Sequence, residues 1–158
     1  MRVYLPLTLA GLAGLQSSGS LGPAPLAGHA VTPLLRREWD AADDEELEYA
    51  VLMAAAFDSL VLIGELGGEP RRVVVVADVD EAMVRVGADE TAVEVLVDVA
   101  RATCRAVHVD DPAAAADVTA ALGRLAAARE GDGPALGAVS LTDHELLWFA
   151  TQEIPDLL

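Results

Sequence analysis

The stretch Asp43–Leu66, DDEELEYAVLMAAAFDSLVLIGEL, predicts one long helix around which the rest of the chain packs. From Ala50 to Ile63 the stretch is apolar nearly all the way round, which is typical of a buried helix. Its acidic first residues suit the positive end of a helix dipole. Gly67 and Gly68 follow directly and supply the left-handed conformation at which helices commonly end.

A membrane-spanning helix is the alternative interpretation of this stretch. Spanning a bilayer takes about 20 consecutive, predominantly apolar residues. The unbroken apolar run ends at Phe57, and Asp58 and Glu65 interrupt the remainder of the helix. Asp58 is also the only polar residue on the helix face formed by Leu47, Ala50, Val51, Ala54, Phe57 and Val61. We therefore expect a core helix and no membrane partner.

Composition narrows the classes of function. The chain has 158 residues, 53% of them hydrophobic, which suits a single domain over residues 1–158 with a sizeable core. A net charge of −16 repels phosphate backbones, so we expect no nucleic-acid partner. The chain contains no lysine, which excludes Schiff-base and phosphate-loop lysine chemistry. Its single cysteine, Cys104, forms no disulfide within the chain, which favours a cytoplasmic protein.

Shorter elements are expected on both sides of the long helix. The β-branched run RRVVVVAD at residues 71–78 predicts a strand that is buried on both faces. Further strands are predicted at residues 2–5, 26–32, 82–86, 93–100, 105–110 and 136–141, and further helices at residues 9–16, 34–39, 112–129 and 143–152. This alternation favours an α/β or α+β fold, with a mixed, partly parallel sheet packed by helices around the long buried helix.

The two ends of the chain also resemble each other. Asp43, Glu45, Leu47, Tyr49 and Ala50 align without gaps, at an offset of 100 residues, with Asp143, Glu145, Leu147, Phe149 and Ala150. A βαβα pseudo-repeat would explain the match. The alternative is that a chain rich in alanine, leucine and glycine matches itself through composition alone.

Two aspartates at strand ends are the candidate metal ligands. Asp78 ends the valine-rich strand, and Asp110 ends the strand that contains His108. If these strands are parallel neighbours, both carboxylates meet at one sheet edge, where they could bind Mg²⁺. His108 points to the same strand face as Asp110 and is the candidate catalytic base. The structural alternative is that the aspartates only end strands and cap turns.

Other catalytic patterns are missing from the sequence. No zinc-ligand spacing, no nucleophile elbow around a serine and no glycine-rich phosphate loop occurs. Cys104 lies in a strand rich in small apolar residues, where a cysteine usually serves as a core residue. We therefore predict no cofactor, apart from the Mg²⁺ that the strand-end aspartates could bind.

The last segment carries Trp148 and Phe149 in a chain whose aromatic content is only 4%. Aromatic side chains often anchor interfaces, so these two residues are candidates for self-association or for binding a protein partner. The alternative is that they close the protein's own core, because terminal segments stay ordered only when something holds them.

Several segments together resemble a family of short actinobacterial proteins of unknown function. They are RVYLP at the start, GPAPL and AVTP, EELEYA, VHVDDP, and the closing DHELLWFATQEIPDLL, which is the most specific of them. The resemblance covers most of the chain and is weakest over residues 81–104. It implies an actinobacterial, cytoplasmic protein and carries over no activity, cofactor or catalytic residue.

The sequence therefore leaves three hypotheses for the function. The first is a cytoplasmic binding or interaction module that self-associates. The second is a small Mg²⁺-dependent enzyme that acts on a phosphorylated metabolite through Asp78, Asp110 and His108. The third is a structural subunit that works only in complex with another protein.

Overall fold

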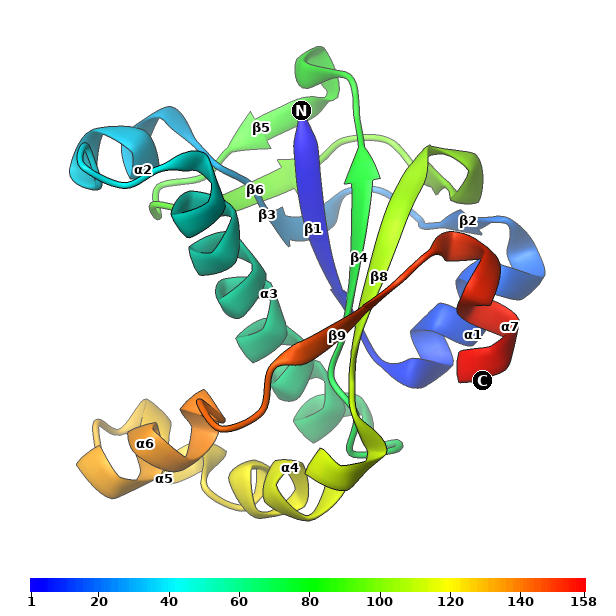
Figure 1. The fold of residues 1–158 in the computed structure, drawn as a ribbon. Coiled ribbons are helices and arrows are strands. Elements are labelled where there is room, and N and C mark those ends of the chain that lie inside the picture. The colour runs from blue at the N-terminus through cyan, green and yellow to red at the C-terminus, as the bar shows by residue number, and fades with distance from the viewer.

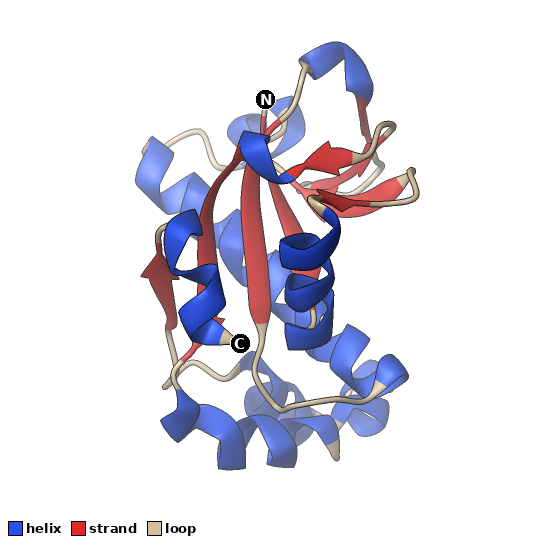
Figure 2. Cartoon of the chain, turned by 90° about the vertical axis from the view of Figure 1, so that its right-hand side faces the viewer, coloured by secondary structure: helices blue, strands red, loops and turns tan.

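The computed structural model describes all 158 residues and shows an α+β fold with one seven-stranded sheet (Figures 1 and 2). The strands are β1 (Arg2–Leu7), β2 (Ser20–Leu21), β3 (Leu26–His29), β4 (Val73–Asp78), β5 (Val84–Val86), β6 (Ala92–Val95), β7 (Val99–Ala100), β8 (Cys104–Asp110) and β9 (Leu146–Phe149). The helices are α1 (Leu9–Ser18), α2 (Pro33–Glu38), α3 (Asp44–Leu66), α4 (Ala115–Leu122), α5 (Leu125–Arg129), α6 (Gly133–Ser140) and α7 (Ile154–Leu157).

The strand order in the large sheet is β5-β6-β3-β1-β4-β8-β9, and every neighbouring pair is antiparallel. The prediction of a partly parallel sheet is therefore wrong. β3 and β4 do run in the same direction, and the segment between them contains α3. They are not neighbours in the sheet, because β1 lies between them and is antiparallel to both.

The predicted long helix is confirmed as α3. Its start is fixed by a capping box, in which the Asp43 side chain accepts from the backbone N–H of Glu46 and the Glu46 side chain accepts from that of Asp43. The chain then leaves the helix at Gly67, whose φ is 76°.

The burial of α3 is one-sided, in contrast to the prediction. Its buried residues face the sheet and α4–α6, whereas Tyr49, Phe57 and Leu66 are exposed. It is the one helix in the structure long and apolar enough to cross a membrane by length and composition. Its buried side chains pack against the sheet and against α4, α5 and α6.

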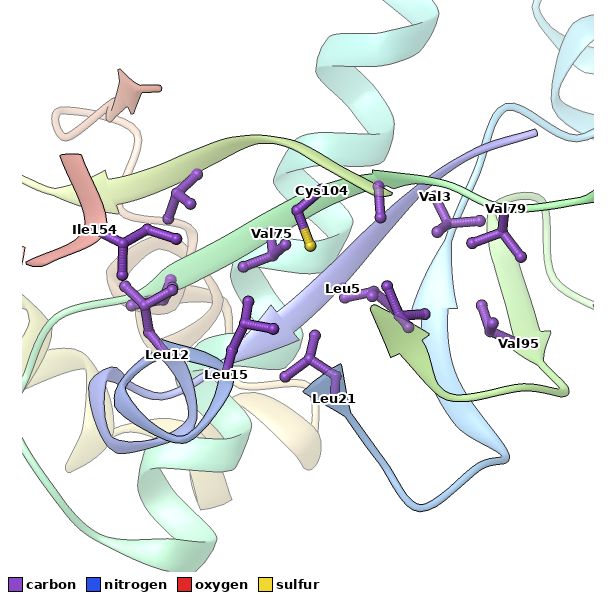
Figure 3. Packing of buried hydrophobic residues seen from close by; sticks show 14 of the residues in the cluster. Val3, Leu5, Leu12, Leu15, Leu21, Val75, Val79, Val95, Cys104 and Ile154 are labelled. Atoms are coloured by element: carbon purple, nitrogen blue, oxygen red, sulfur yellow. The ribbon is translucent and has the colours of Figure 1, made fainter. Parts of the chain in front are cut away.

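Two apolar layers sandwich the sheet. Val73 and Val75 of β4 point into the larger layer, which α1 and α7 cover and which Figure 3 shows in part. Val74 and Val76 point to the other face, toward α3. This confirms the prediction that the valine-rich strand is buried on both sides. A third cluster joins the C-terminal half of α3 to α4, α5 and α6 at one end of the molecule (Figure 1).

The C-terminal third differs most from the sequence prediction. The sequence predicts a strand at residues 136–141, but these residues belong mainly to α6, which Asp132 caps and whose first turn contains Pro134. Residues 143–152 were predicted as a helix, but they contain β9, which pairs with β8. Leu47 and Tyr49 are therefore helical while their aligned partners Leu147 and Phe149 are in a strand, so the pseudo-repeat is wrong.

A buried ion pair joins the beginning of β4 to the end of β8. The side chain of Asp110 is completely buried and that of Arg72 nearly so. The guanidinium donates to both carboxylate oxygens, from Nε to Oδ2 at 2.9 Å and from Nη2 to Oδ1 at 2.8 Å, and the Arg72 backbone N–H donates to Oδ2 at 2.8 Å. Nη2 also donates to the His144 carbonyl at 2.9 Å, just before β9. One pair thus connects three strands.

We predict that Asp110→Ala lowers the free energy of unfolding by about 3–5 kcal/mol, because it leaves the Arg72 charge buried without a partner. The combined variant Arg72→Met, Asp110→Leu should recover most of that loss, since it removes both charges. Urea unfolding measures these differences. The control is Asp78→Ala at the exposed Asp78–Arg105 pair, with an expected loss of about 0–1 kcal/mol. A loss of less than about 1 kcal/mol for Asp110→Ala would contradict the argument.

Candidate functional site

The sheet opens between β1 and β3. β1 pairs with β4 at every position from Arg2 to Leu7, but with β3 only where Tyr4 lies opposite His29. Pro6 has no N–H with which to continue the pairing. β5 and β6, which continue the sheet beyond β3, run across the direction of the central strands β1, β4 and β8 (Figure 1).

A cavity of about 710 Å³ occupies this opening and is bounded by β1, α1, β2, β3 and α3. Its size lies within the range of about 300–1,000 Å³ that small-molecule sites occupy. Its apolar side chains are those of Leu5, Leu7, Leu15, Leu21, Leu26, Ala27, Val61 and Leu62. Asp58 of α3 is its only charged residue, and we call it the Asp58 cavity.

His29 holds the Asp58 side chain in place. The Nε2 atom of His29 lies 2.9 Å from Oδ2 of Asp58, and its Nδ1 atom lies 2.9 Å from Oγ1 of Thr91. In the tautomer protonated at Nε2, the imidazole donates to the carboxylate and accepts from the hydroxyl. His29 is only 8% exposed, whereas 46% of the Asp58 side chain is accessible. The buried imidazole therefore fixes a carboxylate that remains accessible to a ligand.

A carboxylate, an imidazole and a hydroxyl in a row also occur in hydrolytic triads. Here the order does not serve nucleophilic attack, because Thr91 does not line the cavity. The residue that does face the cavity is the carboxylate. The arrangement therefore suits binding of a cation or a hydrogen-bond donor.

The structure does not bring Asp78 and Asp110 together. β4 and β8 are antiparallel, so their final residues lie at opposite ends of the strand pair. Asp78 pairs with Arg105, with 2.6 Å between Nε and Oδ2, and Asp110 pairs with Arg72. No group of three or more histidine, cysteine, aspartate or glutamate side chains in the chain is arranged to hold a metal ion.

His108 lies on the α3 side of the sheet, in a second cavity of about 320 Å³ that we call the His108 cleft. Burial lowers the pKa of the His108 imidazole below its ordinary value. Its Nδ1 atom is buried and has no hydrogen-bond partner. Tyr4 lies in the same cleft, and burial raises the pKa of its phenol to about 12.

Trp148 and Phe149 point to opposite faces of β9. Phe149 packs against the larger core, whereas Trp148 is 60% exposed and lines the His108 cleft. Of these two aromatic residues, Trp148 is therefore the one that is exposed to a partner. Self-association through Trp148 stays a prediction. Cys104 is a core residue, and burial raises the pKa of its thiol to about 11, which disfavours the reactive thiolate.

All 158 residues of the chain match the model of DUF6912, a family of unknown function. The chain belongs to this family. No curated protein and no solved structure matches the chain. Membership in DUF6912 therefore supplies no activity, and the chemistry of its sites has to be argued from their geometry.

The sequence predicted neither cavity. The one signal for the first was Asp58, a lone carboxylate on an otherwise apolar helix face. Its partner His29 is 29 residues away and gave no local signal. The opening itself depends on where Pro6 falls in the sheet, which no local pattern indicates.

We predict that His108 makes stability depend on pH. Above about pH 6.5 the imidazole is neutral in both the folded and the unfolded state and contributes nothing. As the pH falls below that value the unfolded state takes up a proton while the native state, with its lowered pKa, resists, so stability falls.

His108→Gln should reduce this loss between about pH 7.5 and about pH 5.5, by less than about 1.4 kcal/mol per pH unit. Urea unfolding of both proteins at the two pH values measures the difference. The same loss in both proteins would contradict a lowered pKa for His108.

Proposed function

We propose that the protein binds a small, apolar organic amine in the Asp58 cavity. The observation that carries the proposal is a single accessible carboxylate in the wall of an apolar cavity of about 710 Å³. Such cavities hold ligands mainly through apolar contact, and a few placed polar groups fix the ligand's orientation.

The apolar walls account for affinity. Burial of apolar ligand surface against these leucine and valine side chains contributes about 25 cal/mol per Å² before the costs of association. The walls come from five elements of the folded structure, so the site is largely formed before a ligand enters. A preformed site loses little free energy to ordering when it binds.

Asp58 accounts for the choice of an amine. Its Oδ2 atom accepts from His29, while no protein group bonds to Oδ1, which leaves that oxygen for an ammonium group. The net charge of −16 favours the approach of cations and opposes anions. A carboxylate or phosphate ligand would meet Asp58 with no cation in the cavity wall to offset the repulsion.

The alternative is the Mg²⁺-dependent enzyme that acts through Asp78, Asp110 and His108. The separation of the two aspartates and the burial of Asp110 count against it. No residue lines the Asp58 cavity in the geometry of an activated nucleophile. A binding protein is therefore the better supported proposal, and we expect it to act in the cytoplasm.

The test uses two probes that share one carbon skeleton, 1-aminoadamantane and adamantane-1-carboxylate. The amine should raise the melting temperature progressively as its concentration exceeds the dissociation constant, because it binds the native state only. The carboxylate should bind at least about tenfold more weakly. Calorimetric titration gives both dissociation constants. Equal binding of the two probes, or no binding of either, would contradict the proposal.

Two variants locate the site. Asp58→Asn should weaken the amine about tenfold and remove the preference over the carboxylate. Gly14→Leu should block both probes, since Gly14 lines the cavity and a Cβ there meets no atom within 4 Å. Gly137→Leu is the matched control, because Gly137 is an unobstructed glycine in α6 that does not line the cavity. Unchanged amine binding in Gly14→Leu would exclude this cavity.

A further inference from the structure

A third cavity, of about 500 Å³, lies where three turns of the chain meet. They are the last turn of α1, the turn that follows β7 and the turn that follows β9. Arg101 joins them, because its backbone N–H donates to the Gly19 carbonyl at 2.8 Å and its Nη2 atom donates to the Thr151 carbonyl at 3.3 Å. Most of the lining side chains carry hydroxyl, amide or guanidinium groups, and none is acidic. We call it the Arg101 cavity.

The guanidinium of Arg101 is the only charged group in this cavity, and it has no acidic partner. Eight of the ten arginines in the chain form ion pairs with carboxylates. The other two are Arg71, which makes three side-chain hydrogen bonds to backbone carbonyls, and Arg101, which makes one. A guanidinium has five N–H donors, so Arg101 keeps most of its donor capacity for another molecule.

The free donors of the cavity are accessible. The Nη1 atom of Arg101 makes no hydrogen bond and reaches solvent, whereas its Nε atom is shielded and lies out of reach of a ligand. The Nε2 atom of Gln16 and the Oγ1 atom of Thr151 line the same cavity, also reach solvent and bond to no protein group. A positive charge among accessible donors is the arrangement that binds an oxyanion, since hydrogen bonds from a guanidinium to a carboxylate are among the strongest in proteins.

The charge of the protein favours an anion with a single negative charge. The net charge of −16 opposes anions, and the opposition grows with the charge of the ligand. Salt screens charges beyond about 8 Å at physiological ionic strength, so the acidic residues that matter most are those nearby, and none lines the cavity. One guanidinium matches one carboxylate, while the negative end of the α1 dipole disfavours a second charge. A monocarboxylate therefore fits better than a phosphate ester.

The walls favour a polar ligand. Gln16, Gln152 and Thr151 offer amide and hydroxyl groups that can pair with hydroxyl groups of a bound molecule. An apolar ligand would cover these groups without replacing their hydrogen bonds to water, which costs free energy. The walls thus differ from those of the Asp58 cavity, which are mainly leucine and valine side chains.

We propose that the Arg101 cavity is a second binding site, which takes a small monocarboxylate that carries several hydroxyl groups. The carboxylate accepts from Nη1 of Arg101, and the hydroxyl groups bond to the side chains of Gln16 and Thr151. This ligand class is opposite in charge and in polarity to the apolar amine of the Asp58 cavity. The two cavities share only Ser17 and Ser18 and no charged residue.

The experiment compares D-glucuronate with D-glucuronamide, which keeps the sugar ring and replaces the carboxylate by an uncharged amide. Glucuronate should shift the backbone ¹H–¹⁵N signals of Gly19, Arg101 and Ala102 in a saturable way, and glucuronamide should bind at least about tenfold more weakly. No saturable shift at these residues, or equal binding of the two probes, would overturn the proposal. Glucose 6-phosphate is the third probe, and tighter binding of this dianion than of glucuronate would overturn the choice of a monocarboxylate.

Arg101→Gln should weaken glucuronate about tenfold and remove its preference over glucuronamide. The matched control is Arg85→Gln, because Arg85 lies on an exposed strand, pairs with Glu94 and does not line the cavity. Both variants change the net charge equally, so Arg85→Gln should bind glucuronate like the parent protein. An equal loss in both variants would assign the effect to net charge and overturn the site.

A second pair of variants keeps the Arg101 side chain and its hydrogen bond to Thr151. Ala102 is exposed and lines the cavity, so substitutions there leave the core intact. Ala102→Glu should weaken glucuronate by placing a carboxylate in the wall, while Ala102→Gln, of nearly the same size, should weaken it much less. Equal binding by these two variants would contradict an anion site here.

Asp58→Asn should bind glucuronate like the parent protein, because Asp58 does not line the Arg101 cavity. Loss of glucuronate binding in that variant would place the probe in the Asp58 cavity and overturn the second site. Failure of the amine probes leaves this result untouched, because the two cavities have no charged residue in common.

Discussion

The Arg72–Asp110 ion pair is the constraint on which the arrangement of the sheet depends. Arg72 precedes β4 and Asp78 ends it, while Arg105 lies near the start of β8 and Asp110 ends it. Both segments therefore run from an arginine to an aspartate. Antiparallel pairing places unlike charges together at each end, and both Arg72–Asp110 and Arg105–Asp78 pairs form. Parallel pairing would place like charges together, and at the Asp110 end the charges are fully desolvated, where an unpaired charge is most costly.

The position of β1 explains both cavities. β3, α3 and β4 form a crossover whose strands would be parallel neighbours if nothing lay between them. β1 fills that place, antiparallel to both strands, and Pro6 stops its pairing with β3 after Tyr4. The opening at this point becomes the Asp58 cavity. Because α3 connects β3 to β4, it packs mainly against the middle of the sheet, and the His108 cleft lies between its first half and the strands β1, β4, β8 and β9.

Elements with local signals were predictable from the sequence, and elements defined by distant partners were not. α3 has its own cap and stop, and the unbroken valine run of β4 requires burial on both faces. Residues 146–149, LLWF, carry no such signal, and only pairing with β8 makes them a strand. α6 was predictable, since Asp132 and Pro134 begin a helix much as Asp111 and Pro112 do. The charged residues at the ends of β4 and β8 also favour antiparallel pairing of these two strands. They are informative only once the two strands are known to be neighbours.

The two cavities lie along one rigid element. α3 presents Glu48 and Tyr49 to the His108 cleft and Asp58 to the Asp58 cavity, ten residues further on, which corresponds to about 15 Å of helix. The helix between them is continuous, and Val51, Ala55 and Ala56 anchor it in the core. Coupling between sites requires an element with two alternative arrangements that both ligands bias. A packed, unbroken helix provides no such element, so the geometry favours a ligand in the Asp58 cavity that leaves the His108 cleft unchanged.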